Sequence, residues 1–338
     1  ERGNWLVHGR AVQPGVPDVL PPLPPGAPIN RLGLAQWLVD PANPLTGRVI
    51  VNRFWAQLFG RGLVETVEDF GTQGDRPVYP GLLDWLAQRF VHEHRWSVKA
   101  LLRELVLSAT YRQSSQVTPE KQEADPYNRY LTRGPRFRLS AEQVRDQALV
   151  ASGLLSRKQY GPSVMPYQPE GVWNVIRHAA RWETSPGEDR YRRGVYTFSR
   201  KTIPYPSLET FDRPSREFCV SRRIRTNTPL QAMVTLNDPV YVEAAAELAR
   251  LMREEGGETP AAQIAYGYRR LLFKAPDAAR LDRLLQFYEA TRQDYAADTL
   301  STRQLVRSAA AETAAAEQAA LVNVANVLLN LDEALVKN

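Results

Sequence analysis

Apolar side chains recur at intervals of three and four residues along most of this chain, the spacing that places them on one face of an α-helix. The segment 46–59 is apolar on most of its circumference, so we expect a helix there at the centre of a core, ended by Gly60. Narrower apolar stripes predict more helices in this half of the chain, which begin at Asn30, Pro80, Ser97 and Ser140.

Helical spacing returns near Pro229 and continues to the end of the chain. Asp238 followed by Pro239 forms an N-cap and first-turn pair, and Thr259 with Pro260 repeats it. The helices expected in this half cover residues 239–253, 260–273, 277–295 and 309–336.

Two segments lack this periodicity. Seven prolines between Val12 and Pro28 exclude helix and favour an irregular arm. Residues 156–228 are the least regular part, with 194–199 as the best candidate for a short strand. We therefore predict a mainly α fold, an irregular multi-helix domain with long Pro-rich loops and at most a small β element.

Four segments make up the expected domain organisation. A Pro-rich N-terminal arm covers residues 1–29, and a first helical block covers 30–155. An irregular Arg-rich insert with short strands follows at 156–228. We expect the C-terminal helical block, 229–338, to pack on the first block.

The composition is that of a folded protein, with 43% hydrophobic and 24% charged residues among 338. No apolar run reaches the roughly 18–20 residues of a membrane-spanning helix. The start at Glu1 is what a processed or excised piece looks like, so the lack of a targeting signal says little about location. The single Cys219 excludes a disulfide within the chain, a zinc site of several cysteines and a C-x-x-C-H haem attachment.

The formal net charge of +6 is unevenly distributed. Residues 181–225 hold eleven Arg or Lys against six Asp or Glu. Such an excess suits an anionic partner, whereas the alternative is that these arginines pair with carboxylates inside the fold. Nucleic acid is the weaker choice of partner, because the arginines are mixed with acids and no nucleic-acid-binding motif is visible.

The sequence contains no compact catalytic or metal-binding motif. His92 and His94 lie two residues apart and point to different sides of a helix, which argues against a metal site there. Glycoside cleavage requires an acid and a second carboxylate across the scissile bond. The candidates for these carboxylates, all within distinctive strings of the sequence, are Asp69, Glu188, Asp189, Asp212 and Asp238. The same residues would serve equally well as arginine partners or helix caps.

The densest group of polar residues is the candidate ligand-binding site. It consists of Asn52, Arg53, Arg61, Asp69, Gln73, Arg112, Arg190, Arg192, Arg193, Asp212, Arg216, Asn227 and Gln231. A network that locks loops uses these residue types. A pocket for a sugar or an anionic group uses them too, with Trp55 or Tyr196 as a stacking face. The sequence leaves both interpretations open.

Seven longer strings are specific enough to indicate a family. They are RGNWLVHGRAVQPGVPDVLP from Arg2, NPLTGRVIVNRFWAQLFGRGLVETVEDFGTQGDRP (43–77), LSATYRQSS (107–115), GEDRYRRGVYTF (187–198), TFDRPSREFC (210–219), RTNTPLQAMVTLNDP (225–239) and VANVLLNLDEAL (324–335). In this order they resemble the planctomycete PSD-one domain, a domain of unknown function (fifteen-fifty-three).

The resemblance implies the C-terminal domain of a large protein exported to the periplasm or cell surface by Planctomycetes or related bacteria. It implies no cofactor in this chain, haem c on a separate cytochrome c-like domain, and other domains of the same precursor as partners. Many members carry histidines after the first Asn-Arg-x-Trp, where this chain has Gln57 and Leu58. That difference weakens a metal or proton-transfer role for this helix.

Three functions stay open at this stage, because the resemblance carries no reaction. One is a domain that binds or processes complex carbohydrate, in line with a polysaccharide or other anionic ligand. Another is a non-catalytic structural or docking module for the haem domain or a partner protein. The third is a stand-alone hydrolase or lyase that uses the carboxylates above.

Overall fold

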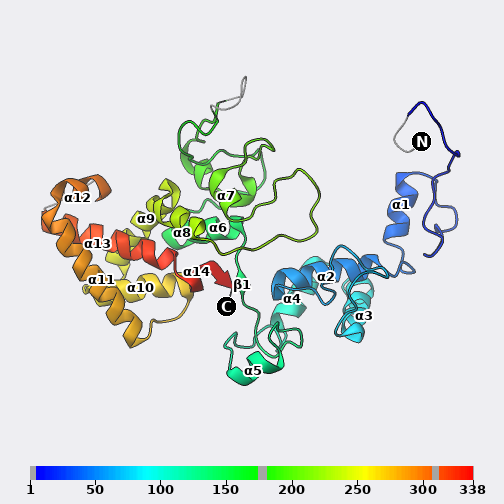
Figure 1. Ribbon diagram of the computed structural model, residues 1–338, viewed down its shortest axis with the longest axis horizontal. Helices are drawn as coiled ribbons and strands as arrows, with labels where there is room; N and C mark the ends of the chain where they lie inside the picture. The colour runs from blue at the N-terminus through cyan, green and yellow to red at the C-terminus, as the bar shows by residue number, and fades with distance from the viewer. Residues whose placement is uncertain (1–4, 174–180, 307–311, 338) are drawn as a thin grey trace. The chain divides into compact units, whose positions relative to one another are not determined.

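The computed structural model describes residues 5–173, 181–306 and 312–337. The chain divides into two compact units, Glu1–Arg136 and Phe137–Asn338. The first runs from blue to green in Figure 1 and the second from green to red. Each unit has a hydrophobic core of its own.

The first unit begins with an irregular arm, as predicted, and continues as short helices. They are α1 (Arg31–Leu38), α2 (Thr46–Phe59), α3 (Pro80–Gln88), the π-helical turn η1 (Arg89–Glu93), α4 (Val98–Leu107) and α5 (Pro119–Ala124). The arm is attached near its end, where the indole Nε1 of Trp37 donates to the carbonyl oxygen of Pro21 at 2.7 Å.

The core of the first unit lies between α2, α3 and α4. Trp55 and Phe59, one turn apart on α2, stack with ring centroids 4.0 Å apart. Val51 of α2 and Leu101 of α4 are completely buried. Since α2 contacts helices on more than one side, its apolar circumference is explained. Gly60 ends α2 as predicted, in the left-handed conformation with φ of +80°.

The second unit contains more helices and a small sheet. Its elements are β1 (Phe137–Arg138), α6 (Ala141–Ser152), the 3-10 turns η2 (Gly187–Tyr191) and η3 (Gly194–Tyr196), α7 (Pro206–Thr210), α8 (Pro229–Asn237), α9 (Pro239–Glu255), α10 (Pro260–Leu272), α11 (Ala278–Ala297), α12 (Thr299–Val306), α13 (Glu312–Leu329), α14 (Asp332–Leu335) and β2 (Val336–Lys337). The strands pair antiparallel, Phe137 with Lys337 and Arg138 with Val336.

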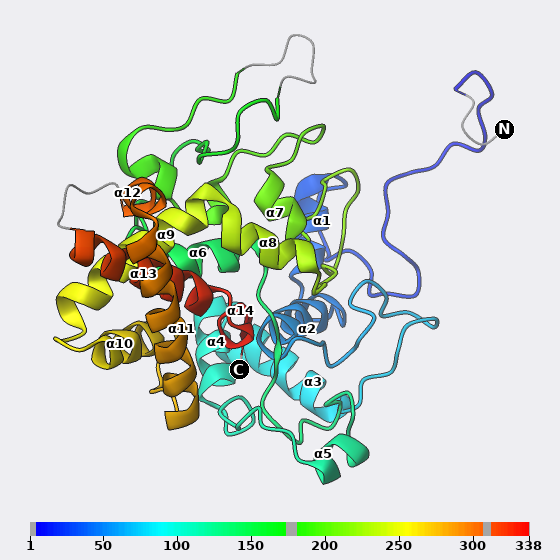
Figure 2. The same cartoon turned by 60° about the vertical axis from the view of Figure 1, so that its left-hand side comes forward.

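The packing of α9 and α13 forms the centre of the second unit, with α6, α10 and α11 around it (Figures 1 and 2). Small residues make this contact, since Ala244 and Ala249 on α9 and Ala325 on α13 are completely buried. On α10, a Cβ at Gly267 would lie 2.7 Å from the sulfur of Met252. A side chain at position 267 would therefore force the buried Met252 to shift.

The predicted helix starts are confirmed by side-chain caps. Each cap oxygen accepts a backbone N–H of the first turn, at Asn30, Ser97, Ser140, Asp238 and Thr259. Ser140 and Gln143 bond reciprocally as a capping box. Because helices dominate both units and the sheet has two short strands, the predicted mainly α fold is confirmed.

The strand predicted at 194–199 is wrong. Gly194 donates its N–H to the carboxylate of Asp146 at 2.6 Å, and Thr197 donates back to the carbonyl of Gly194 at 3.1 Å. These bonds curl residues 194–196 into η3. The β-prone residues that follow reach only an isolated bridge between Thr197 and Val164.

The final helix is shorter than the predicted 309–336, whose first residues lie outside the described part of the chain. It ends at Leu329, after which Asn330 and Leu331 turn the chain into α14 and β2. In addition, α6 belongs to the second unit, where it packs on α9, although the sequence groups it with the first helical block. Packing of the C-terminal block on the first block stays a prediction.

No helix in the described residues is both long and apolar enough to span a membrane.

Candidate functional site

The predicted ligand-binding residues are distributed over both units. The first unit holds Asn52, Arg53, Arg61, Asp69, Gln73 and Arg112, and the second holds Arg190, Arg192, Arg193, Asp212, Arg216, Asn227 and Gln231. The contacts of each residue within its own unit show what it does there.

Asn52 is completely buried on α2 and fixes the turn after this helix. Its Nδ2 donates to the carbonyl of Val64, and its Oδ1 accepts from the N–H of Val64, both at 2.9 Å. Gly62 lies so close that a Cβ there would be 2.3 Å from the Val64 carbonyl oxygen. Because buried backbone groups require partners, the role of Asn52 is to hold this turn.

Asp69 organises the next loop. Its Oδ1 accepts from the N–H of Gly71 at 2.7 Å. The Thr66 hydroxyl donates to the carbonyl of Asp69 and accepts from the N–H of Asp75, both at 2.9 Å. Asp69 therefore helps to place Asp75. The remaining predicted residues of this unit, Arg53, Gln73 and Arg112, are exposed.

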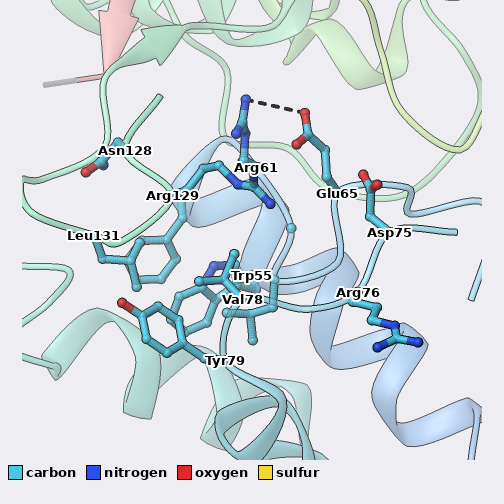
Figure 3. Close-up of a pocket in the computed structure, with 13 residues that line it drawn as sticks. Trp55, Arg61, Glu65, Asp75, Arg76, Val78, Tyr79, Asn128, Arg129 and Leu131 are labelled. Carbon is cyan, nitrogen blue, oxygen red and sulfur yellow. Dashed lines mark ion pairs between the residues drawn. The ribbon is translucent and has the colours of Figure 1, made fainter. Parts of the chain in front are cut away.

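Arg61 lines a pocket that lies wholly within the first unit (Figure 3). The pocket is a shallow hollow, continuous with open solvent, between the end of α2, the loop 61–79 and residues 128–131. Its apolar and aromatic lining comprises Trp55, Phe59, Leu63, Val78, Tyr79 and Leu131. Its charged lining comprises Arg61, Glu65, Asp75, Arg76 and Arg129.

The aromatic residues form the floor of this pocket. Trp55 is only 5% exposed, because it stacks on Phe59 in the core. Tyr79 is more accessible, and its hydroxyl donates to the carbonyl of Tyr130 at 3.2 Å. Tyr79 therefore offers the ring surface that the sequence assigned to Trp55.

The segment 125–131 is held in place by a buried carboxylate. Asp125 is 2% exposed and accepts the N–H groups of Arg129 at 2.7 Å and Tyr130 at 2.9 Å. Asn128 sits in the left-handed region, with φ of +52°. These contacts fix the backbone that carries Asn128 and Arg129 to the pocket.

The charged groups of the rim are partly solvated. Arg61 and Glu65 form an ion pair of 3.3 Å, with both side chains about one-third exposed. The Arg61 guanidinium also lies 5.7 Å from the ring centroid of Tyr127, which is 71% exposed. Figure 3 shows Arg61, Glu65 and Arg129 over the rings of Trp55 and Tyr79. Donors and acceptors thus surround an aromatic floor.

In the second unit, Arg192 holds the loop 158–162 in place. The side chain is 1% exposed, and it donates to the carbonyls of Lys158, Tyr160 and Pro162 at 3.3, 2.6 and 3.2 Å. Its guanidinium lies 3.8 Å from the ring centroid of Tyr196. This contact occupies one face of the Tyr196 ring.

The neighbouring arginines form ion pairs near the surface. Arg193 lies 2.9 Å from the carboxylate of Asp146, and Arg190 lies 3.6 Å from that of Glu243. Tyr191 donates its hydroxyl to Glu243 at 2.7 Å. These pairs attach η2 and its C-terminal end to α6 and α9.

A third network joins α7 to the start of α8. Asp212 accepts the N–H of Thr226 at 2.7 Å and its hydroxyl at 2.8 Å. Gln231 is completely buried and donates to the carbonyl of Thr210 at 3.0 Å, while accepting from Arg138 at 3.0 Å. Arg216 and Asn227 are exposed beside it. Asp212 and Gln231 thus hold the ends of the loop 212–228 together.

Among the described residues, no group of three or more His, Cys, Asp or Glu side chains is arranged to hold a metal ion. His94 Nε2 lies 2.7 Å from Glu104, which ties the end of η1 to α4. Cys219 is exposed.

Several pocket residues were not predicted. Glu65, Asp75 and Arg76 lie inside the distinctive string 43–77, so their position in that string was an available signal. Tyr79 follows it closely. Arg129 has no such signal, since its place depends on contacts with the buried Asp125.

Comparison with known families shows where this architecture belongs. The profile of the family described as protein of unknown function (DUF1553), PSD1, matches residues 30–288. The chain belongs to the DUF1553 family. The predicted resemblance is thereby confirmed, and the DUF1553 match includes both the pocket and the Asp212 network. No curated protein and no solved structure matches the chain.

Proposed function

We propose that the first unit of this DUF1553 protein binds carbohydrate in the pocket beside α2. The observation that carries this proposal is the combination of Tyr79 on the floor with charged side chains around it. Sugars present hydroxyl groups at their edges and C–H groups on their faces. Planar polar groups and an aromatic ring are therefore the surfaces that recognise them.

The size and openness of the pocket limit the ligand. The pocket is shallow and continuous with open solvent, so it suits the edge of one sugar unit of a longer chain and does not enclose a whole ligand. Exposed rings extend the surface beyond the rim, because Tyr127 and Tyr130 are 71% and 60% exposed. A polysaccharide that enters at the pocket would thus find further stacking area on the segment 125–131.

The test is glycan binding by the whole chain. On an array of neutral and acidic glycans we expect retention of a limited set, followed by titration calorimetry with the best ligand. Arg129→Gln and Asp75→Asn should each lower affinity about tenfold, the effect of losing one charged hydrogen bond of about 1.4 kcal/mol. Arg53→Gln provides the matched control, since Arg53 is exposed on α2 outside the pocket lining. Absence of binding to every glycan would contradict the proposal.

A hydrolase is the second candidate, because Glu65 and Asp75 both line the same pocket. Glycoside cleavage needs two carboxyl groups near one bond, one of them as proton donor. Incubation of bound glycans with the chain would then release reducing ends. Glu65→Gln and Asp75→Asn should each abolish that release at glycan concentrations that saturate the variant, although Asp75→Asn binds about tenfold more weakly. If the unaltered chain binds glycans and releases no reducing ends, it is a binding module and the hydrolase proposal is wrong.

The setting of this function is also a proposal, which rests on the family resemblance. The proposed setting is an exported protein, with haem c on a separate domain and the precursor's other domains as partners. Mass spectrometry of the full-length protein from its native cells, in the periplasmic and surface fractions, tests this setting. Signal cleavage and a covalent haem outside this chain are expected.

A further inference from the structure

The loop 212–228 of the second unit carries a cluster of arginines outside the pocket and outside the Asp212 network. Arg213 is the innermost of them, with 7% of its side chain exposed. Its Nε lies 3.8 Å from Oε1 of Glu142, a long ion pair. Its Nη1 is buried and has no hydrogen-bond partner. A buried guanidinium N–H requires an acceptor, and an anion would be a suitable one at a site where positive charge also gathers.

The groups around Arg213 are mainly positive. Burial lowers the pKa of the Arg213 guanidinium, and the charges of Arg216 and Arg223 lower it further, while Glu142 opposes them. Burial and the neighbouring Arg223 lower the pKa of Arg225 in the same direction. Repulsion therefore acts between Arg213 and Arg216, between Arg213 and Arg223, and between Arg223 and Arg225.

Glu142, at the start of α6, forms ion pairs with two members of this cluster. Its Oε2 accepts from Arg223 at 2.6 Å, so Glu142 is shared between Arg223 and Arg213. The adjacent Asp212 is engaged by Thr226 and Gln231. The cluster thus keeps an excess of positive charge that Glu142 alone does not neutralise.

Arg225 is fixed by an aromatic contact. Its guanidinium lies 4.3 Å from the ring centroid of Phe137 on β1. Stacking of this kind orients the planar group while leaving its edge for hydrogen bonds. The cluster therefore has one buried donor, one stacked donor and two donors at the surface.

We propose that Arg213, Arg216, Arg223 and Arg225 form a binding site for a tetrahedral oxyanion, the sulfate or phosphate group of a ligand. Such a group accepts several hydrogen bonds and carries up to two negative charges, and the planar fork of arginine fits it well. The anion would supply the acceptor that Nη1 of Arg213 lacks and would offset the mutual repulsion of the guanidinium groups. This site is separate from the pocket of the proposed function.

The loop also offers a different surface, since Phe218 and Ile224 are 70% and 76% exposed among the arginines. An anionic membrane would use both kinds of side chain. The buried donor of Arg213 favours a discrete anion, because a membrane surface reaches exposed groups only. Vesicle binding therefore enters the test as an alternative outcome.

The test measures the melting temperature of the whole chain in sodium sulfate, sodium phosphate or sodium chloride at matched ionic strength. A ligand that binds the folded state at tenfold its Kd should raise the melting temperature by roughly 3 °C. We expect that rise with sulfate and phosphate and not with chloride. A sulfated oligosaccharide compared with its desulfated form then shows whether the group is recognised on a glycan or only as a free ion.

Matched variants identify the site. Arg216→Gln with Arg225→Gln should fold, because Arg216 is exposed and Arg225 keeps much of its surface exposed although its guanidinium stacks on Phe137, and should lose the sulfate-dependent rise. Arg157→Gln, an exposed arginine outside the cluster, should keep it, and so should Asp75→Asn in the pocket. An equal rise in the double variant would overturn the proposal, as would an equal rise with chloride. Binding to anionic vesicles with no response to sulfate or phosphate would overturn it too.

Discussion

The side chain of Asn52 exchanges two hydrogen bonds, each 2.9 Å long, with the backbone N–H and carbonyl of Val64. Both residues are buried, so water cannot replace the Asn52 amide as the hydrogen-bond partner of the Val64 backbone. The turn that carries Arg61 to the pocket follows α2 directly, so this contact connects the core of the first unit with its candidate site.

Asn52→Ala should destabilise the first unit by about 3 kcal/mol, because it leaves a buried N–H and a buried carbonyl without partners. Urea unfolding followed by tryptophan fluorescence measures the loss. Gln57→Ala, at an exposed position on the same helix, should change the free energy of unfolding by less than about 0.5 kcal/mol. Equal effects of the two substitutions would show that the Val64 contact is unimportant.

Asp212 combines a hydrogen-bonding role with an unusual backbone, since its φ is +62°. Asn tolerates this region better than Ala does. Asp212→Ala should therefore be more destabilising than Asp212→Asn by about 1 kcal/mol. A double-mutant cycle with Thr226→Val should show a coupling of about 1 kcal/mol between the two side chains. Additive effects would argue against a direct contact.

Local features of this fold could be predicted, and features that depend on distant partners could not. The capping box of Ser140 and Gln143 is formed within one helical turn, so the sequence suffices. The residues 194–199 look β-prone, yet Asp146 on α6 captures the N–H of Gly194 and curls the chain. That partner lies 48 residues away, and no local pattern reveals it.

The same distinction applies to the candidate site. The sequence indicated polar residue types that serve both locks and pockets, and the contacts separate the two. Arg192 is surrounded by loop carbonyls, whereas Arg61 lines an open pocket. Which arginine has which neighbours is decided by tertiary packing, so residue type alone could not assign these roles.

Because of Glu142, the free energy of unfolding should fall as the pH falls into the acid range. Burial alone raises the pKa of its carboxyl, but hydrogen bonds from Arg223 and the backbone, with the charges of Arg223 and Arg213, hold it below the ordinary 4.5. A lowered pKa in the folded state means that the stabilisation is complete above the unfolded value of about 4.5 and is lost as pH falls through the folded value.

Denaturant unfolding between pH 3 and pH 7 measures this effect. Glu142→Gln should be less stable than the original chain at pH 7, and the difference should shrink below about pH 4.5. Asp282→Asn, at an exposed carboxylate on α11, should show no such convergence. A difference that stays constant down to pH 3 would mean that Glu142 is not held ionised by the arginines.

The second unit should fold by itself. Its core is formed by helices on both sides of the central pair α9 and α13, and its ends are joined, since Phe137 pairs with Lys337 and Leu139 donates to the carbonyl of Leu335 at 2.9 Å. A fragment of residues 137–338 should therefore show helical circular dichroism and one cooperative melting transition. Residues 141–338, without β1 and Leu139, should melt several degrees lower because the C-terminal strand loses its partner. If the fragment 137–338 is unfolded in isolation, the second unit is not an independent folding unit.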